Sequence, residues 1–86
     1  MIDFKDKVEV VNDWLEDNDF FNIKRSSDNT FIRADGYSSR IIIAVKEDES
    51  TVINVQEIIQ FSIRTHRQVW IASVQDTDRH ILWEII

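Results

Sequence analysis

The spacing of hydrophobic residues along the chain predicts two helices. The first runs from Asp3 to Asn18, where Asp3 is suited to cap the start and Asn18 to end the helix in a left-handed conformation. The second runs from Asn54 to His66, and Asn54 with Glu57 three residues later forms a capping-box-like start. Apolar residues recur at helical spacing on one face of each segment, at Phe4, Val8, Val11 and Leu15 in the first and at Val55, Ile58, Ile59 and Ile63 in the second.

Extended apolar segments predict strands at residues 20–25, 30–35, 40–46, 69–74 and 81–86. Asp35 and Gly36 indicate a hairpin turn between the second and third of these strands. The third strand is an unbroken β-branched run, which is typical of a strand covered on both faces. The order α-β-β-β-α-β-β therefore predicts an α+β fold with a mixed sheet flanked by helices.

The length, the net charge and the composition of the chain narrow the class of protein. With 86 residues, the chain has room for a single domain over residues 1–86. The formal net charge is −6 and there is no cysteine, so a disulfide framework and a thiolate zinc site are both excluded. No apolar run approaches the ~18–20 residues needed to span a bilayer, and the N-terminus has no signal-peptide pattern, so we expect a cytoplasmic protein with no membrane partner.

Several enzyme classes lack their motifs. With one glycine, neither a phosphate-binding loop nor a dinucleotide fingerprint is possible, and no serine stands in a G-x-S-x-G setting. His66 and His80 have no metal-ligand spacing around them. His66 closes the second predicted helix, where a partial positive charge suits the helix dipole.

The order of elements resembles that of a known nuclease family. A helix, a three-stranded meander, a crossover helix and a further strand, over about residues 3–74, are similar to the core of the restriction-endonuclease-like, or PD-(D/E)xK, superfamily. That family has an Asp at the start of its second strand and an acid-x-Lys near the end of the third. The two carboxylates hold a divalent metal that activates water, and the Lys positions that water. The resemblance implies Mg²⁺ or Mn²⁺ as cofactor and nucleic acid as partner.

Two aspartates compete for the first of these family positions. The predicted hairpin places the start of the second strand beside the end of the third, so Asp28 lies near Lys46. Asp35 lies beside the turn, roughly 20 Å from Lys46 at ~3.3 Å per residue, and is interpreted as a turn residue. Asn29 is the other candidate for the aligned position. The resemblance thus implies Asp28 and Lys46 as catalytic residues.

The acid-x-Lys motif is incomplete, because the triplet reads Ala44-Val45-Lys46. Alternation puts Ala44 and Lys46 on the same face, so the Lys is placed correctly and its carboxylate partner is missing. Glu47, or Glu57 on the second helix, could act as a migrated ligand. With Asp28 and Glu47 as the expected metal ligands, the resemblance implies a nuclease core whose catalysis is weak or lost.

Basic residues near the second helix suggest a site for phosphate. Arg64 and Arg67 belong to a small basic cluster at the C-terminus of that helix and are the predicted nucleic-acid contacts. Lys24, Arg25 and Arg33 could complete a phosphate-facing patch with them. Because an acidic chain repels nucleic acid at long range, such a patch must act locally.

A second functional hypothesis comes from the C-terminal strand, residues 81–86, which ends on apolar residues. At the edge of a sheet, such a strand invites pairing with another chain, either as a homodimer or with a protein partner. Ala44, the acidic composition and the small size favour this non-catalytic interaction module. The hairpin geometry and Lys46 favour the nuclease-related protein, so the sequence leaves both functions open.

Overall fold

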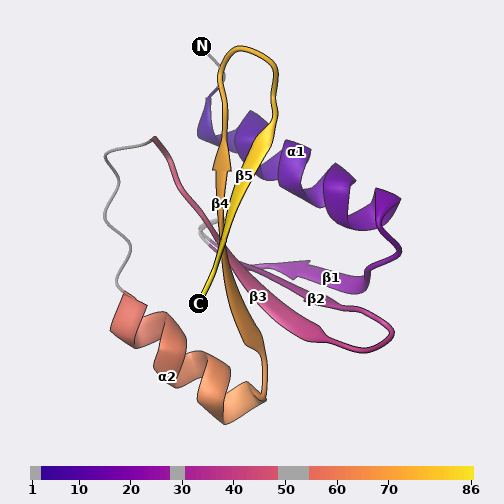
Figure 1. Ribbon diagram of the computed structural model, residues 1–86, viewed down its shortest axis with the longest axis vertical. Coiled ribbons are helices and arrows are strands. Elements are labelled where there is room, and N and C mark those ends of the chain that lie inside the picture. The colour runs from indigo at the N-terminus through magenta and orange to yellow at the C-terminus, as the bar shows by residue number, and fades with distance from the viewer. Residues whose placement is uncertain (1–2, 28–30, 49–54) are drawn as a thin grey trace.

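The computed structural model describes residues 3–27, 31–48 and 55–86 (Figure 1). Within them the order α-β-β-β-α-β-β and the α+β class are confirmed, with a five-stranded mixed sheet and a helix on each face. The elements are α1 (Phe4–Asp17), β1 (Phe21–Arg25), β2 (Phe31–Asp35), β3 (Arg40–Val45), α2 (Val55–Thr65), β4 (Gln68–Val74) and β5 (Ile81–Ile85). Neither helix of this part of the chain is long and apolar enough to cross a bilayer.

The ends of α1 confirm one prediction and correct another. Asp3 caps the helix, because its carboxylate accepts a hydrogen bond from the Asp6 backbone N–H at 2.9 Å. Asn18 is not left-handed, since its φ is −105°, and Asp19 takes the positive φ of 65° instead. The Asn18 side chain donates to the Trp14 carbonyl at 2.8 Å, so Asn18 caps the helix from an ordinary conformation and leaves the reversal to the next residue. The predicted capping residue Asn54 lies outside the described residues.

The strands lie in the order β1-β2-β3-β4-β5. All neighbours are antiparallel except β3 and β4, which are parallel and are joined by the crossover through α2 (Figure 1). In the β2–β3 hairpin Asp35 pairs with Arg40 and Phe31 with Ala44. This register confirms that the start of β2 lies beside the end of β3.

The core has two layers that meet at β3. Ile41 and Ile43 point into the cluster beneath α1, and Ile42 and Ala44 point into the cluster beneath α2. Every residue from Ile41 to Val45 is buried, which confirms the prediction that this strand is covered on both faces. On its side, α2 packs over β3 and β4 and leaves a hollow over β1 and β2.

Candidate functional site

Two of the residues predicted for a nuclease-type site, Lys46 and Glu47, follow directly after β3. The Lys46 backbone N–H donates to the Ala72 carbonyl at 2.9 Å. Glu47 is exposed, and its backbone carbonyl accepts a hydrogen bond from the buried Lys7 ammonium at 2.7 Å. Lys46 and Lys7 line a cavity of about 80 Å³ together with Asp76. Asp28, the expected partner of Lys46, lies outside the described residues, as does Asn29.

Position 44, where the nuclease family has an acidic residue, is an alanine with apolar neighbours. Ala44 is fully buried in a cluster with Ile42, Ile58, Val69 and Ile71. In the ranges that the structure describes, no group of three or more His, Cys, Asp and Glu residues is placed to hold a metal ion. Mg²⁺ or Mn²⁺ binding by Asp28 and Glu47 therefore stays a prediction.

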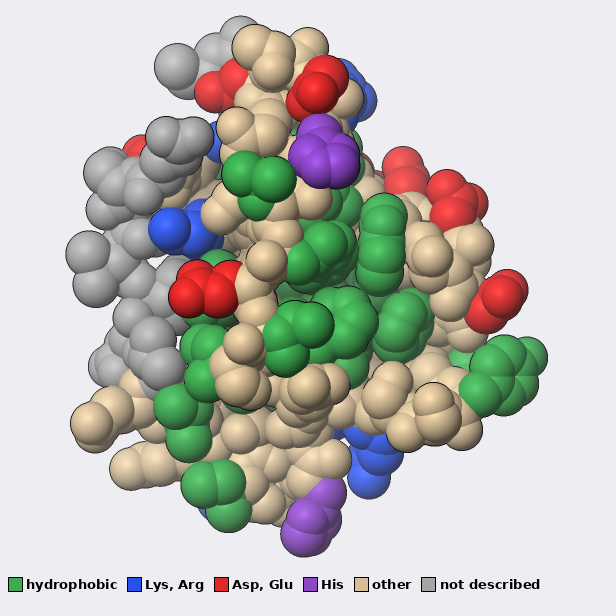
Figure 2. Space-filling view, in the orientation of Figure 1, with side chains coloured by type: hydrophobic (Ala, Val, Ile, Leu, Met, Phe, Trp, Pro, Cys, Tyr) green, Lys and Arg blue, Asp and Glu red, His purple; other side chains and the backbone are tan. Residues whose placement is uncertain are grey.

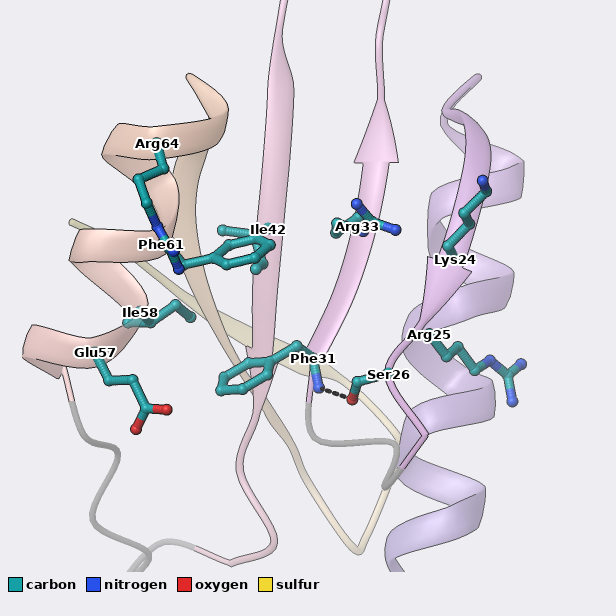
Figure 3. A pocket seen from close by; sticks show the side chains of 10 residues that line it. All are labelled: Lys24, Arg25, Ser26, Phe31, Arg33, Ile42, Glu57, Ile58, Phe61 and Arg64. Carbon is teal, nitrogen blue, oxygen red and sulfur yellow. Dashed lines mark hydrogen bonds between the residues drawn. The ribbon is translucent and has the colours of Figure 1, made fainter.

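A larger cavity of about 410 Å³ lies between α2 and the open face of β1 and β2 (Figure 3). We call it the basic cavity. Its lining comes from four elements and the β1–β2 loop, which bring together residues far apart in the sequence: Lys24, Arg25, Ser26, Phe31, Arg33, Ile42, Glu57, Ile58, Phe61 and Arg64. Ser26 fixes the entry to β2, because its hydroxyl oxygen accepts from the Phe31 N–H at 3.1 Å.

Three cations of the basic cavity have no ion pair within the described part of the chain: Lys24, Arg33 and Arg64. Lys24 and Arg33 are also direct cross-strand partners, an arrangement of like charges that destabilises a sheet. Arg25 differs from them, because it points away toward α1 and forms an ion pair with Glu9 at 2.8 Å. The Arg25 guanidinium lowers the pKa of the Glu9 carboxyl. Glu57 contributes one carboxylate to the same lining, so the described lining still has a net positive charge, which favours an anion.

The floor of the basic cavity is aromatic and aliphatic. Phe31 and Phe61 point into the space from β2 and α2, with Ile42 and Ile58 behind them (Figure 3). The Arg64 guanidinium lies 5.7 Å from the centre of the Phe61 ring, within the range of a cation–π contact. A cationic rim therefore meets an aromatic surface at one site. Neither phenylalanine is distinguishable from a core residue in the sequence, so sequence reasoning missed both.

Arg67, the second predicted nucleic-acid contact, lies inside the fold. One of its guanidinium N–H groups donates to the carbonyls of Ala34 and Ile41, each at 3.1 Å, and lies 3.0 Å from an Asp35 oxygen. Its side chain is only 9% exposed. The two predicted contacts therefore have different surroundings. Arg64 faces the basic cavity, whereas Arg67 connects the β2–β3 hairpin to the start of β4.

Asp35 is the last residue of β2 and the centre of this ionic cluster. Burial raises the pKa of its carboxyl, but a hydrogen bond from Asn22 at 3.3 Å and the charges of Arg67 and Arg40 outweigh that effect. The net result is a pKa below the ordinary value of an aspartate. Asp35 therefore stays ionised and stabilises the hairpin through its ion pairs with Arg40 and Arg67.

Comparison with known proteins adds no family to this geometry. No protein-family model matches the chain, and a search of curated proteins finds no significant similarity.

Proposed function

We propose that this protein associates with nucleic acid and binds a single-stranded segment in the basic cavity, as a relative of PD-(D/E)xK nucleases whose catalysis is weak or lost. One observation carries the proposal: Lys24, Arg33 and Arg64 line one cavity without ion pairs in the described residues, although the whole chain has a net charge of −6. These cations outnumber the one carboxylate of the lining, that of Glu57, and such a cluster in an acidic protein favours an anionic ligand.

The aromatic floor of the basic cavity favours a single strand as the ligand. Proteins that bind single-stranded nucleic acid combine a positive groove for the phosphates with aromatic rings on which bases stack. Phe31 and Phe61 supply such rings beside the three cations. The volume of about 410 Å³ falls in the range of small-ligand sites, so it suits one nucleotide with its base turned inward. Stacked bases inside a duplex could not reach this floor.

The surroundings of Ala44 support weak or lost catalysis. A carboxylate at this position would share an apolar cluster with Ile42 and Ile58, where an unpaired charge is strongly disfavoured. Any surviving metal-dependent reaction would depend on Asp28 and Glu47 for Mg²⁺ or Mn²⁺ and on Lys46 to position water. Nucleic-acid binding needs none of these groups.

The test is fluorescence anisotropy of a labelled ten-nucleotide single strand titrated with protein. Arg33→Gln and Arg64→Gln should each weaken binding by at least about tenfold, the effect of one charged contact. With three phosphate contacts, the affinity should fall with salt at a log–log slope of about −2, and each variant should reduce that slope by about 0.7.

Arg79→Gln is the matched control, because it removes the same charge from an exposed residue in the β4–β5 turn, outside the basic cavity. The proposal is wrong if Arg33→Gln and Arg64→Gln lose no more affinity than Arg79→Gln. It is equally wrong if duplex binds as tightly as the single strand, since only the single strand can use the phenylalanines.

A second function, as an interaction module, is favoured by one observation. β5 is an edge strand of the sheet, and Leu82, Ile85 and Ile86 are 51%, 57% and 48% exposed. A long apolar edge is a template for pairing with another strand. We propose that β5 binds a protein strand by extending the sheet. Sedimentation velocity over a range of protein concentrations tests whether the chain associates with itself, and an Ile85→Lys variant should reduce any association, because it places a charge on the exposed apolar edge.

A further inference from the structure

The two edges of the sheet are built differently. Edge β1 has features that discourage pairing: its register with β2 shifts between Phe21 and Lys24, and Asn22 within that shift has a φ of 52°. Edge β1 also carries Lys24 and Arg25. Edge β5 has neither feature, since its five residues pair with β4 in unbroken register and Glu84 is its only charge. Among the residues that the structure describes, only the β1 edge thus has features that protect it against another strand.

The backbone of β5 is ready for a further strand. His80 accepts a hydrogen bond from the Gln75 N–H, and Ile86 donates to the Val69 carbonyl, so these residues direct their backbone groups toward β4. Because the direction alternates along a strand, Ile81, Trp83 and Ile85 direct their N–H and C=O groups toward the open edge.

The sequence of β5 complements itself in one antiparallel register. With a two-fold axis at Trp83, Ile81 lies opposite the partner's Ile85 and Trp83 opposite the partner's Trp83, so all three outward-directed residues find hydrogen-bonding partners. Their side chains share the α1 face of the sheet, where every cross-strand pair would be apolar. A strand with this palindromic pattern fits a second copy of itself better than an arbitrary partner.

Exposed apolar surface continues beyond the strand itself. Hydrophobic side chains gather in the middle of the face shown in Figure 2, between β5 and α1. Trp83 of β5 contacts Trp14 of α1, with their ring centres 4.7 Å apart. We propose that β5 pairs with β5 of a second copy of this chain, antiparallel and centred on Trp83, to form one continuous sheet. The inference rests on the interaction function proposed for β5 and names its partner and register.

The test exploits the absence of cysteine from the chain, so that an introduced thiol is unique. In the register centred on Trp83, residue 82 lies opposite residue 84 of the partner as a non-hydrogen-bonded pair with Cα atoms ~4.5 Å apart, within disulfide range. Residue 82 lies diagonally from its own copy at roughly 7–8 Å, which exceeds that range. Chains carrying Leu82→Cys and chains carrying Glu84→Cys are distinguished by a mass tag. Each variant is oxidised alone, and a mixture of the two is oxidised in parallel.

The expected result is a disulfide-linked dimer in the mixture, formed at least about tenfold faster than in either variant alone. Ser38→Cys, in the exposed turn between β2 and β3 and away from β5 in the strand order, measures random collision. Rapid linking of Leu82→Cys to itself, or of Glu84→Cys to itself, would overturn the Trp83 axis while leaving self-association through β5 intact. A monomer in sedimentation together with collision-level linking in every sample would overturn both the axis and the second copy as partner.

Salt provides an independent readout. Two copies of net charge −6 repel each other, so self-association should strengthen as salt screens that repulsion. Binding of nucleic acid in the basic cavity should weaken over the same range. Self-association that weakens with salt would mean that ion pairs, and not the apolar β5 edge, hold the copies together, and it would overturn the inference.

Discussion

Replacing Arg67 by alanine should remove a large part of the stability of this fold. The Arg67 guanidinium donates to two backbone carbonyls and pairs with Asp35 at 3.0 Å, while its side chain is 9% exposed. Truncation would leave the Asp35 carboxylate, itself 20% exposed, without its closest cation. Breaking a buried pair in this way costs about 3–5 kcal/mol. A domain of this size has a total free energy of unfolding of only about 4–13 kcal/mol.

Arg40→Ala is the matched control, because Arg40 faces the same carboxylate. It lies 3.6 Å from Asp35, and its side chain is 55% exposed. Solvent screens this pair, so its loss should cost less than about 1 kcal/mol. The comparison keeps the residue type, the replacement and the anionic partner constant, and it varies the burial of the guanidinium together with its hydrogen bonds to the Ala34 and Ile41 carbonyls.

Urea unfolding followed by tryptophan fluorescence measures both variants. With a slope of about 1–1.5 kcal/mol/M, Arg67→Ala should lower the midpoint by roughly 2–5 M, and Arg40→Ala by less than about 1 M. If the free energies of unfolding of the two variants agree to within about 0.5 kcal/mol, burial does not make the Arg67 contacts strong, and the reasoning from exposure is refuted.

Three further substitutions test other contacts. Ala44→Asp should destabilise the fold by several kcal/mol at neutral pH, because burial raises the pKa of the new carboxyl; the loss should shrink toward pH 4, and recovery with Mn²⁺ at pH 7 would instead reveal a metal site. Asp35→Asn should lower the melting temperature at pH 7 and match the wild type in strong acid. Because the pKa of Asp35 is lowered in the folded state, its carboxylate stabilises the fold above the unfolded-state pKa of about 3.9, and this stability is lost as the pH falls through the folded-state pKa. A difference in melting temperature that is the same at pH 7 and pH 2 would contradict this. Lys7→Ala should cost about 1.5–3 kcal/mol in urea unfolding, because its buried ammonium donates to the Glu47 carbonyl at 2.7 Å and lies 3.7 Å from Asp76, and a loss below 0.5 kcal/mol would show that the contact is weak.

The order of the elements was predictable because each one leaves a periodic trace in the sequence. Helical spacing marked the face of α1 from Val8 to Leu15, and the continuous apolar run of β3 indicated a strand covered twice. Turn chemistry at Asp35 gave the hairpin, and counting from it gave the pairing of Phe31 with Ala44. These are local signals, so a single sequence contains them.

The basic cavity depends on an irregularity that leaves no such trace. Phe21 pairs with Asp35, and regular counting from there would place Lys24 opposite Ile32, whose side chain faces α1. The bulge at Asn22 shifts the register by one residue, so Lys24 pairs with Arg33 and joins the opposite face. A shift of one residue in β1 thus decides whether the cavity has this cation.

The different surroundings of Arg64 and Arg67, at the end of α2, were also not predictable from the sequence. Both suit a helix C-terminus, and both are equally plausible phosphate contacts as residue types. Only the packed structure brings Arg67 against Asp35, some thirty positions earlier in the chain, and leaves Arg64 beside Phe61. A tertiary contact, and not local pattern, separates the structural cation from the one that is available to a ligand.

The one parallel strand pair of the described sheet, β3 with β4, has a consequence for how this chain folds. Each antiparallel pair joins strands with a short connection between them, whereas β3 and β4 are linked through α2, so that their pairing begins with Ile41 and Gln68. Closing a loop of that length costs about 1.5 kcal/mol more entropy than closing a short hairpin. The meander with α1 and the β4–β5 hairpin can therefore form early and separately, and we expect their docking along β3 to limit the folding rate. Until they dock, the apolar edge of β3 is open, and this is the interval in which the chain is most exposed to aggregation.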